Sequence, residues 1–320
     1  MNKRTIEVIL IILAFGLLGG LVYLTTSKRE TYKARETIKV AYTADSVATQ
    51  VLFDLAKEKD YFSKYNLAVE ETVNDKTSHI LVSTGKVDLS ISVIVLPLNN
   101  YLNDEKLLWV SNVFSNTPDL YMVLKDRNAT NIKFGVSKIG GITNIIADSV
   151  ASNLGWKKDN IEYVQAGDIT TRFAYLEKGI INATFIYPGE GLDQARQKGY
   201  TILEPKEIYG NVTVPVGVFT SQTTLDNRRP ALKRFVLAID DFKQYLLDNR
   251  TETIKYIQSK YNISEDEANG VYSGIAKYTT FEKPKTTQID TIKTGIVEIL
   301  KPKNPDRGTT GFINLITSAK

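Results

Sequence analysis

The stretch GVSKIGGITN, residues 135–144, combines two adjacent glycines with polar side chains. The apolar run before it is typical of a strand, and the apolar spacing after it predicts a helix from Ile142 to Leu154. A turn that leads into a helix can present backbone amides and the positive end of the helix dipole, which attract an anion or a polar group. A P-loop would carry Lys-Ser/Thr after its last glycine, and a dinucleotide site a third glycine, whereas Thr143 and Asn144 follow here. The turn therefore keeps only the generic property of a cradle for an anion or a polar group; the alternative is a tight turn in which Thr143 or Asn144 caps the helix.

The same sequence pattern occurs in two further segments, GKVDLSIS (85–92) and KGIINATFIYPGE (178–190). Each has a glycine suited to end a helix, then two apolar residues, then Asp88 or Asn182, and then a strand-like run. If both strands end at one cleft, the residues after them would face a ligand. The alternative is the ordinary helix–turn–strand joint of an α/β protein, in which the glycines only end helices.

Strand-like runs alternate with helical patterns along most of the chain, which predicts parallel sheets covered by helices. The first alternation begins at Thr37 and ends with two strands, LLWVSNVF and LYMVLK, the second ending near Lys125. After the turn-rich segment DRNATN a second alternation begins at KFGV, and VTVPVGVFT (212–220) is a β-rich segment suited to return the chain to the first unit. Long helical patterns follow Pro230. Two α/β units joined by two crossings predict a cleft between them, where small ligands bind at the carboxyl ends of strands.

Five short motifs in this order resemble the substrate-binding proteins of ABC transporters, of the nitrate/sulfonate/taurine and thiamine-pyrimidine-precursor type. AKEKDYFSKYNLAVE resembles that family's GyF-x-x-x-gL-x-V-x pattern, with Asp60 in place of the usual glycine. GKVDLSISVIVLP resembles its G-x-x-D joint, and KFGVSKIGG followed by NLGWKKDNIEYV resembles its kvgv-x-x-xG and lGl-x-x-x-d-v patterns. EKGIINATFIYPGE resembles its second joint, G-x-x-dA-x-x-x-x-P, with Asn182 where Asp is typical.

The resemblance implies an α/β protein with the type II periplasmic-binding-protein fold. In that fold two α/β lobes surround a cleft, close over a solute and present it to a membrane permease. The lobes are expected at residues 37–127 plus 219–320 and at 128–218. The ligand-binding residues would lie in the loops that follow the strands: Asp45, Ser46, Ser90, Ser92, Gly140, Gly141, Ile142, Thr143, Asn144, Tyr187 and Glu190.

The charged and aromatic members of this set favour a nitrogen-containing organic solute over a sulfonate or nitrate. Asp45 and Glu190 bring negative charge, and Tyr187 offers a ring for stacking. The only basic residue close to these positions in the sequence is Lys138, just before Gly140. An anion would have to rely on backbone amides, whereas an amino-substituted heterocycle could use both acids and the ring.

The N-terminus carries an uncharged apolar run at residues 8–24, VILIILAFGLLGGLVYL, behind Lys3 and Arg4. With its neighbours the run approaches the ~20 residues that a membrane-spanning helix needs. We expect residues 1–27 to form a transmembrane anchor, with a long signal peptide as the alternative, and residues 28–36 to form a charged stalk. Because no second apolar span follows, the body is expected on the extracytoplasmic side of the cell membrane.

Composition excludes several other classes of function. The 40 basic and 36 acidic residues are spread along the chain, without the clustered basic stripe of a nucleic-acid site. The absence of cysteine excludes thiolate catalysis and disulfides, and a single histidine excludes His-rich metal sites. We expect no cofactor, no metal and no nucleic acid.

The expected function is solute binding for an ABC permease with its ATPase subunits, without catalysis. One alternative is a membrane-tethered sensor, although such receptors normally continue into a second span and an output domain, and this chain ends at Lys320. A less favoured alternative is an enzyme similar to thiamine-pyrimidine synthases. That chemistry is associated with a cysteine-rich motif and an active-site histidine, whereas cysteine is absent here and His79 is expected outside the cleft. Asp168 is expected as the N-cap of the following helix, with Thr170 as the alternative.

Overall fold

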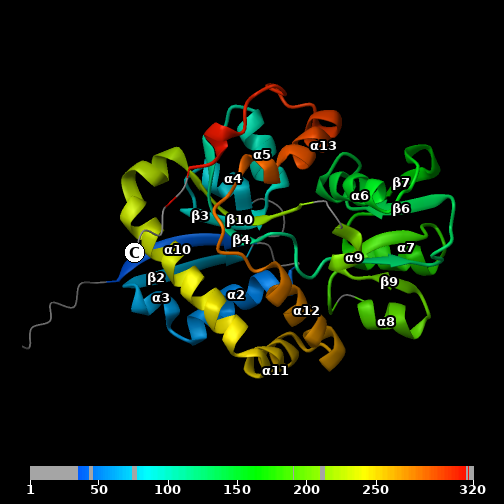
Figure 1. The fold of residues 1–320 in the computed structure, drawn as a ribbon, viewed down its shortest axis with the longest axis horizontal. Helices are drawn as coiled ribbons and strands as arrows, with labels where there is room; N and C mark the ends of the chain where they lie inside the picture. Colours follow the sequence, from blue (N-terminus) through cyan, green and yellow to red (C-terminus); the bar gives the residue numbers. More distant parts are fainter. Residues whose placement is uncertain are drawn as a thin grey trace, which may run out of the picture. The chain divides into compact units, whose positions relative to one another are not determined.

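Two five-stranded sheets organise the chain (Figure 1). The computed structural model describes residues 35–42, 46–73, 78–189, 191–209, 213–314 and 316. Within these ranges no helix is long and apolar enough to cross a membrane. The anchor predicted at residues 8–24 lies outside the described residues, as do Asp45 and Glu190.

The first sheet has the strand order β2-β1-β3-β10-β4. β1 is parallel to β2 and β3, and β10 is antiparallel to β3 and β4. The strands are β1 (Glu36–Tyr42), β2 (Leu67–Val73), β3 (Leu89–Val93), β4 (Leu107–Phe114) and β10 (Val216–Ser221). The segment around residue 216, which was expected to return the chain to the first unit, forms β10, and the whole strand, not only residues from 219, belongs to this sheet.

The second sheet has the strand order β7-β6-β8-β5-β9. β6 is parallel to β7 and β8, and β5 is antiparallel to β8 and β9. The strands are β5 (Tyr121–Leu124), β6 (Ile132–Val136), β7 (Ile161–Gln165), β8 (Ala183–Ile186) and β9 (Thr201–Leu203).

The position of β5 corrects the boundary predicted near residue 127. The strand lies before that boundary in sequence but pairs within the second sheet, so the first crossing runs through residues 115–120. All four residues of β5 are buried. An apolar run of this kind indicates a buried strand but carries no information about which sheet it joins.

Helices accompany both sheets, and most agree with the sequence patterns (Figure 1). Between the strands of the first sheet lie α2 (Val47–Glu58), α3 (Tyr61–Lys64), α4 (Ser78–Ser83) and α5 (Val95–Leu102). Between the strands of the second lie α6 (Ile142–Asn153), η1 (Lys158–Asn160), α7 (Ile169–Glu177), α8 (Leu192–Gln197) and α9 (Pro205–Tyr209). The sequence analysis missed α5 and α9, which are short and begin close to a proline.

The C-terminal part is helical, as predicted. It comprises α10 (Gln222–Asp248), α11 (Arg250–Tyr261), α12 (Glu265–Tyr278), η2 (Thr286–Gln288), α13 (Asp290–Leu300) and η3 (Thr310–Phe312). α10 begins before Pro230, with Ser221 as its N-cap, and non-helical angles at Arg228 interrupt it just ahead of the proline. α12 packs against α2 of the first unit, and α13 contacts both α5 and α6. These helices therefore connect the two sheets.

The close approach of a β4 side chain explains why β10 has a glycine at position 217. A Cβ at Gly217 of β10 would lie 2.2 Å from the indole nitrogen of Trp109, which is fully buried on β4. The indole stacks on Phe219 and donates a hydrogen bond to the Ser111 carbonyl oxygen at 2.9 Å. Only glycine leaves room for this ring between β10 and the edge strand β4.

Candidate functional site

A cavity of about 830 Å³ lies between the two sheets. Its walls come from the N-terminus of α2, from α4, from the residues after β3, β6, β7 and β8, and from the crossing segment at residues 117–120. Leu300, at the end of α13, completes the wall. The volume is in the range of ligand pockets, and the location at the carboxyl ends of parallel strands is where α/β proteins bind small molecules.

Most of the predicted site residues in the described ranges line this cavity. They are Ser46, Ser92, Gly140, Gly141, Ile142, Thr143 and Tyr187. Their contact with a solute stays a prediction. Ser90 does not line the cavity, because it lies deeper in β3, fully buried and paired with Ala41 and Phe219. Asn144 is turned into its own loop and does not line the cavity either.

The loop before α6 is closed by its own side chains. The Gly140 amide donates to Asn144 Oδ1 at 3.0 Å, and the Gly141 amide donates to the Lys138 carbonyl oxygen at 2.9 Å. The Ser137 amide donates to Thr143 Oγ1 at 2.9 Å. The expectation that the two glycine amides are open to a ligand is therefore wrong. Thr143 and Asn144 lie in the first turn of α6, and their side chains reach back to satisfy the loop.

The N-terminus of α2 is occupied by a carboxylate that the sequence analysis did not identify. Ser46 caps the helix by accepting a hydrogen bond from the Thr49 amide. Its hydroxyl donates to Asp119 Oδ1 at 2.9 Å, and the Ala48 amide donates to Asp119 Oδ2 at 2.9 Å. Asp119 is fully buried, and burial raises its pKa to about 6 against the opposing effect of these hydrogen bonds. In sequence Thr117-Pro118-Asp119 reads as an ordinary turn, so no local pattern could have identified this contact.

His79 corrects another expectation. It lies in α4, is 8% exposed and lines the cavity, although it was expected outside the cleft. Burial lowers its pKa, while Glu105 has a smaller raising effect, so the imidazole is neutral near pH 7. The prediction for His79 was wrong because α4 has only six residues, too few for the sequence pattern to indicate which side of the helix is buried.

The second unit contributes charged groups to the same cavity. Asp168 caps α7, as predicted, by accepting a hydrogen bond from the Thr171 amide at 2.7 Å. Arg172 lies one turn further on, is 4% exposed and lines the cavity together with Lys138. The sequence analysis counted Lys138 as the only base and missed Arg172, which stands inside an amphipathic helix pattern.

The corner after β8 is attached to the C-terminal helices. Glu267, in the first turn of α12, accepts hydrogen bonds from the amides of Gly189 at 2.9 Å and Asp193 at 3.1 Å. The carboxylate is buried, and its burial raises its pKa. Tyr187, which lines the cavity, lies two residues before Gly189. This contact therefore positions one wall of the cavity.

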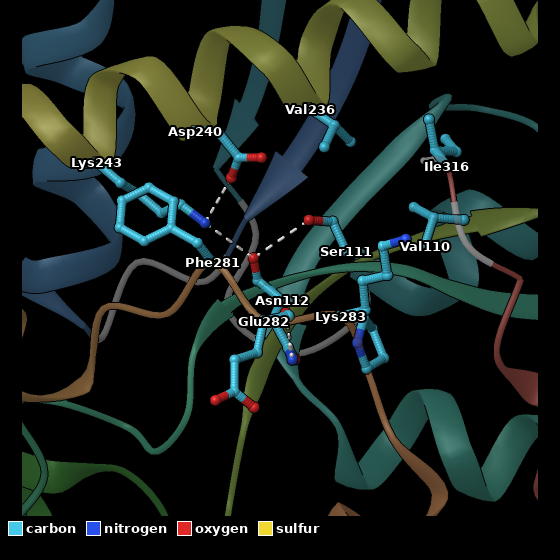
Figure 2. A pocket seen from close by; sticks show the side chains of 11 residues that line it. Val110, Ser111, Asn112, Val236, Asp240, Lys243, Phe281, Glu282, Lys283 and Ile316 are labelled. Atoms are coloured by element: carbon cyan, nitrogen blue, oxygen red, sulfur yellow. Dashed lines mark hydrogen bonds and ion pairs between the residues drawn. The ribbon is translucent and has the colours of Figure 1, made fainter. Parts of the chain in front are cut away.

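A second, much smaller cavity lies beside α10 (Figure 2). Its volume of about 20 Å³ has room for one water molecule. The ammonium group of Lys243 donates to Asp240 Oδ1 at 2.6 Å and to the carbonyl oxygens of Thr280 at 2.7 Å and Asn112 at 3.3 Å, with the Phe281 ring beside it. This cluster ties α10 to β4 and to the segment after α12, and it is too small for a solute.

No group of three or more His, Asp or Glu side chains that could hold a metal ion occurs in the part of the chain that the structure describes. The arrangement is a solute-sized cavity with hydroxyl groups, one histidine and a few charged groups on its walls.

The fold is shared with several solved structures. A sulfonate ABC transporter's periplasmic sulfonate-binding protein from Methylobacillus flagellatus matches at a TM-score of 0.69 with 12% identity, over 88% of this chain and 92% of that one. The ligand-binding component of an ABC-type import system from Staphylococcus aureus matches at 0.63 with 16% identity, over 88% and 97%. A Candida albicans protein described as having the generic periplasmic-binding-protein fold matches at 0.64 with 17% identity, over 87% and 96%. The chain therefore has the two-lobed α/β fold of periplasmic-binding proteins, as predicted.

Comparison of sequences leads to a family. No curated protein matches the chain. Residues 51–253 match the family described as NMT1/THI5 like, a range that covers more than half of the chain and includes most of the cavity wall. The match confirms the resemblance noted in the sequence. This chain is a member of the NMT1/THI5-like family.

Proposed function

We propose that this protein is the extracytoplasmic solute-binding component of an ABC importer, which captures a small organic solute and delivers it to a permease with its ATPase subunits. The observation that carries the proposal is the cavity of about 830 Å³ between two α/β units. Fold relatives named as binding components of ABC import systems support it. The walls carry hydroxyl, imidazole and aromatic groups that can orient a small molecule by hydrogen bonds and stacking.

The lobes are proposed to move relative to each other when the solute binds. The first lobe would comprise the first sheet with α10 to α13, and the second lobe the second sheet with its helices. The crossing segments at residues 115–120 and before β10 would absorb the motion. Solution scattering with saturating solute should show a smaller radius of gyration, and an unchanged radius would contradict closure.

Residues 8–24 are proposed to anchor the protein to the cell membrane, with the body outside the cytoplasm. The proposal depends on the length and the uncharged, apolar composition of this run. Intact-mass measurement of protein extracted from membranes should give the full chain. A species that lacks about the first 27 residues would indicate cleavage instead.

Solute binding is tested by thermal unfolding with a panel of compounds. The panel contains nitrate, taurine, alkanesulfonates, thiamine, its pyrimidine precursors and riboflavin. A compound at 100 times its Kd stabilises the folded state by about 2.7 kcal/mol, which raises Tm by several degrees in a protein of this size. Absence of any shift across the panel, in protein that unfolds cooperatively, would contradict the proposal for these compound classes.

A matched pair of variants locates the binding site. Tyr187→Ala removes an aromatic side chain from the cavity wall, whereas Tyr200→Ala removes one that does not line the cavity. The shift caused by the strongest compound should fall by more than half in Tyr187→Ala and should persist in Tyr200→Ala. Equal shifts in both variants would place the solute elsewhere.

A further inference from the structure

The N-terminus of a helix commonly receives an anion, because its first amides lack partners within the helix and the dipole is positive there. α2 has 12 residues, and its first turn contributes Ser46 and Thr49 to the cavity wall. A solute carboxylate or sulfonate would find this end of the cavity attractive if the amides were open. In this chain they are not open, because Asp119 is there.

Both carboxylate oxygens of Asp119 are engaged at this helix end, one by the Ser46 hydroxyl and one by the Ala48 amide. Thr117 and Leu120, on either side of Asp119 in sequence, line the cavity. The negative charge therefore lies directly behind the wall. Because Asp119 is fully buried, water and salt screen its charge far less than that of a surface acid.

The loop before α6, whose first turn also lines the cavity, holds its own amides. The Gly140 amide donates to the Asn144 side chain, and the Gly141 amide donates to the Lys138 carbonyl oxygen. These two loop amides are therefore satisfied by oxygen atoms of the chain itself.

Ser92 offers a polar atom of the first unit to a ligand. Ser92 lines the cavity at the end of β3 and is 7% exposed. Its hydroxyl oxygen has no hydrogen-bond partner within the described part of the chain. A hydroxyl can accept a hydrogen bond from an amino or ring N–H group.

We propose that Asp119 is a specificity-determining residue, which occupies the N-terminus of α2 and so makes the first-lobe wall of the cavity select a neutral or cationic, hydrogen-bond-donating group and reject an anionic one. The inference rests on the proposed solute-binding function. It concerns one wall only, since the second-lobe wall carries charges of both signs, Arg172 and Lys138 together with Asp168.

The test uses methanesulfonate as the anionic probe and compares the wild-type protein with Asp119→Asn and Asp119→Ala at pH 8, by calorimetry. Asn keeps the shape and removes the charge, and Ala also frees the Ala48 amide. The control Asp54→Asn removes a carboxylate from the same helix where it pairs with Tyr261, away from the cavity. Both Asp119 variants should bind methanesulfonate at least about tenfold more tightly than the wild type and the control, as expected for removal of a poorly screened charge. Equal affinity in all four proteins, or no affinity in any, would overturn the proposal.

A pH series provides the second measurement, in case Asp119→Ala does not fold. Lowering the pH from 8 to 5 should strengthen methanesulfonate binding to the wild type, because Asp119 takes up a proton, and should do so less in Asp119→Asn. The comparison with Asp119→Asn separates Asp119 from His79, the other titratable group of this wall, whose pKa is lowered by burial, whereas Tyr121 and Tyr209 beside Asp119 have raised pKa values and stay protonated. The same pH dependence in both proteins would contradict a role for Asp119.

The outcomes separate this inference from the proposed function. If the Asp119 variants bind methanesulfonate more tightly but the wild type binds no panel compound, the role of Asp119 is supported. The same result counts against import of the tested compound classes. An alkanesulfonate that binds the wild type and both variants equally well would overturn the role of Asp119 and leave solute binding intact.

Discussion

The carboxylate of Glu267 in α12 accepts a hydrogen bond from the amide of Gly189, 78 residues earlier in the chain, at 2.9 Å. The same carboxylate also accepts one from the Asp193 amide. A residue of the C-terminal helices thereby holds the corner that carries Tyr187, a part of the cavity wall in the second unit. The structure of one wall depends on a helix that belongs to neither of the two strand alternations.

Glu267→Gln should weaken this contact. The amide side chain can accept from one of the two amides, but its NH₂ group cannot accept from the other, which leaves a buried donor unsatisfied. We expect a loss of about 1–3 kcal/mol in the free energy of unfolding, measured in urea, and weaker binding of the strongest panel compound. The control Glu265→Gln, at an exposed position of the same helix turn, should change neither. Equal behaviour of the two variants would contradict the positioning role.

The raised pKa of Asp119 predicts how stability depends on pH. The folded-state pKa of about 6 lies above the ordinary value of 3.8, so between these pH values the folded protein binds the proton more strongly than the unfolded chain. The stabilising contribution of this group is full below about pH 4 and is lost as the pH rises through about 6. The difference in unfolding free energy between the wild type and Asp119→Asn should therefore fall by on the order of 3 kcal/mol from pH 4 to pH 7. A difference that does not vary with pH would show that Asp119 has an ordinary pKa.

Ser90 and Ser92 on β3 form a natural pair for mutation. Neither hydroxyl oxygen has a partner among the described residues, but only Ser92 lines the cavity. Ser90→Ala and Ser92→Ala should each leave the unfolding free energy unchanged or raise it by up to about 1 kcal/mol, because a buried polar group without a partner is removed. Only Ser92→Ala should weaken binding of the strongest panel compound, measured by calorimetry. Weaker binding in Ser90→Ala as well would indicate an indirect effect through the strand.

Lys243 is expected to be the most sensitive of the mutated positions for stability. Its ammonium group is almost fully buried, and its partners are the Asp240 carboxylate and two carbonyl oxygens. Lys243→Met leaves these oxygens without their donor, which should cost about 3–5 kcal/mol of unfolding free energy in chemical denaturation. Arg229→Met, at an exposed position of α10, should change it by less than about 0.5 kcal/mol. A loss below 1 kcal/mol for Lys243→Met would mean that water replaces the ammonium group.

The sequence by itself determined the alternation of strands and helices, the return of the chain near residue 216 and the family resemblance. These features depend on apolar periodicity and on glycine at turns, which are properties of neighbouring residues and can be read along the chain. The family resemblance implied that Ser46, Ser92, the Gly140–Gly141 turn and Tyr187 face one cleft, and all of them line one cavity in the structure.

Only the tertiary structure decided which atoms in that cavity remain available. The apolar run of β5 gave no sign that it pairs in the second sheet, because pairing depends on partners far away in the sequence. Asp119 meets the N-terminus of α2 from 71 residues away, and α4 turns His79 inward. The Gly140 amide is satisfied by Asn144, although a glycine turn before a helix usually suggests an open anion site. Hydrogen-bond saturation and burial are properties of the folded chain, and for that reason residue types and spacing did not show which polar groups of the cavity wall already have partners.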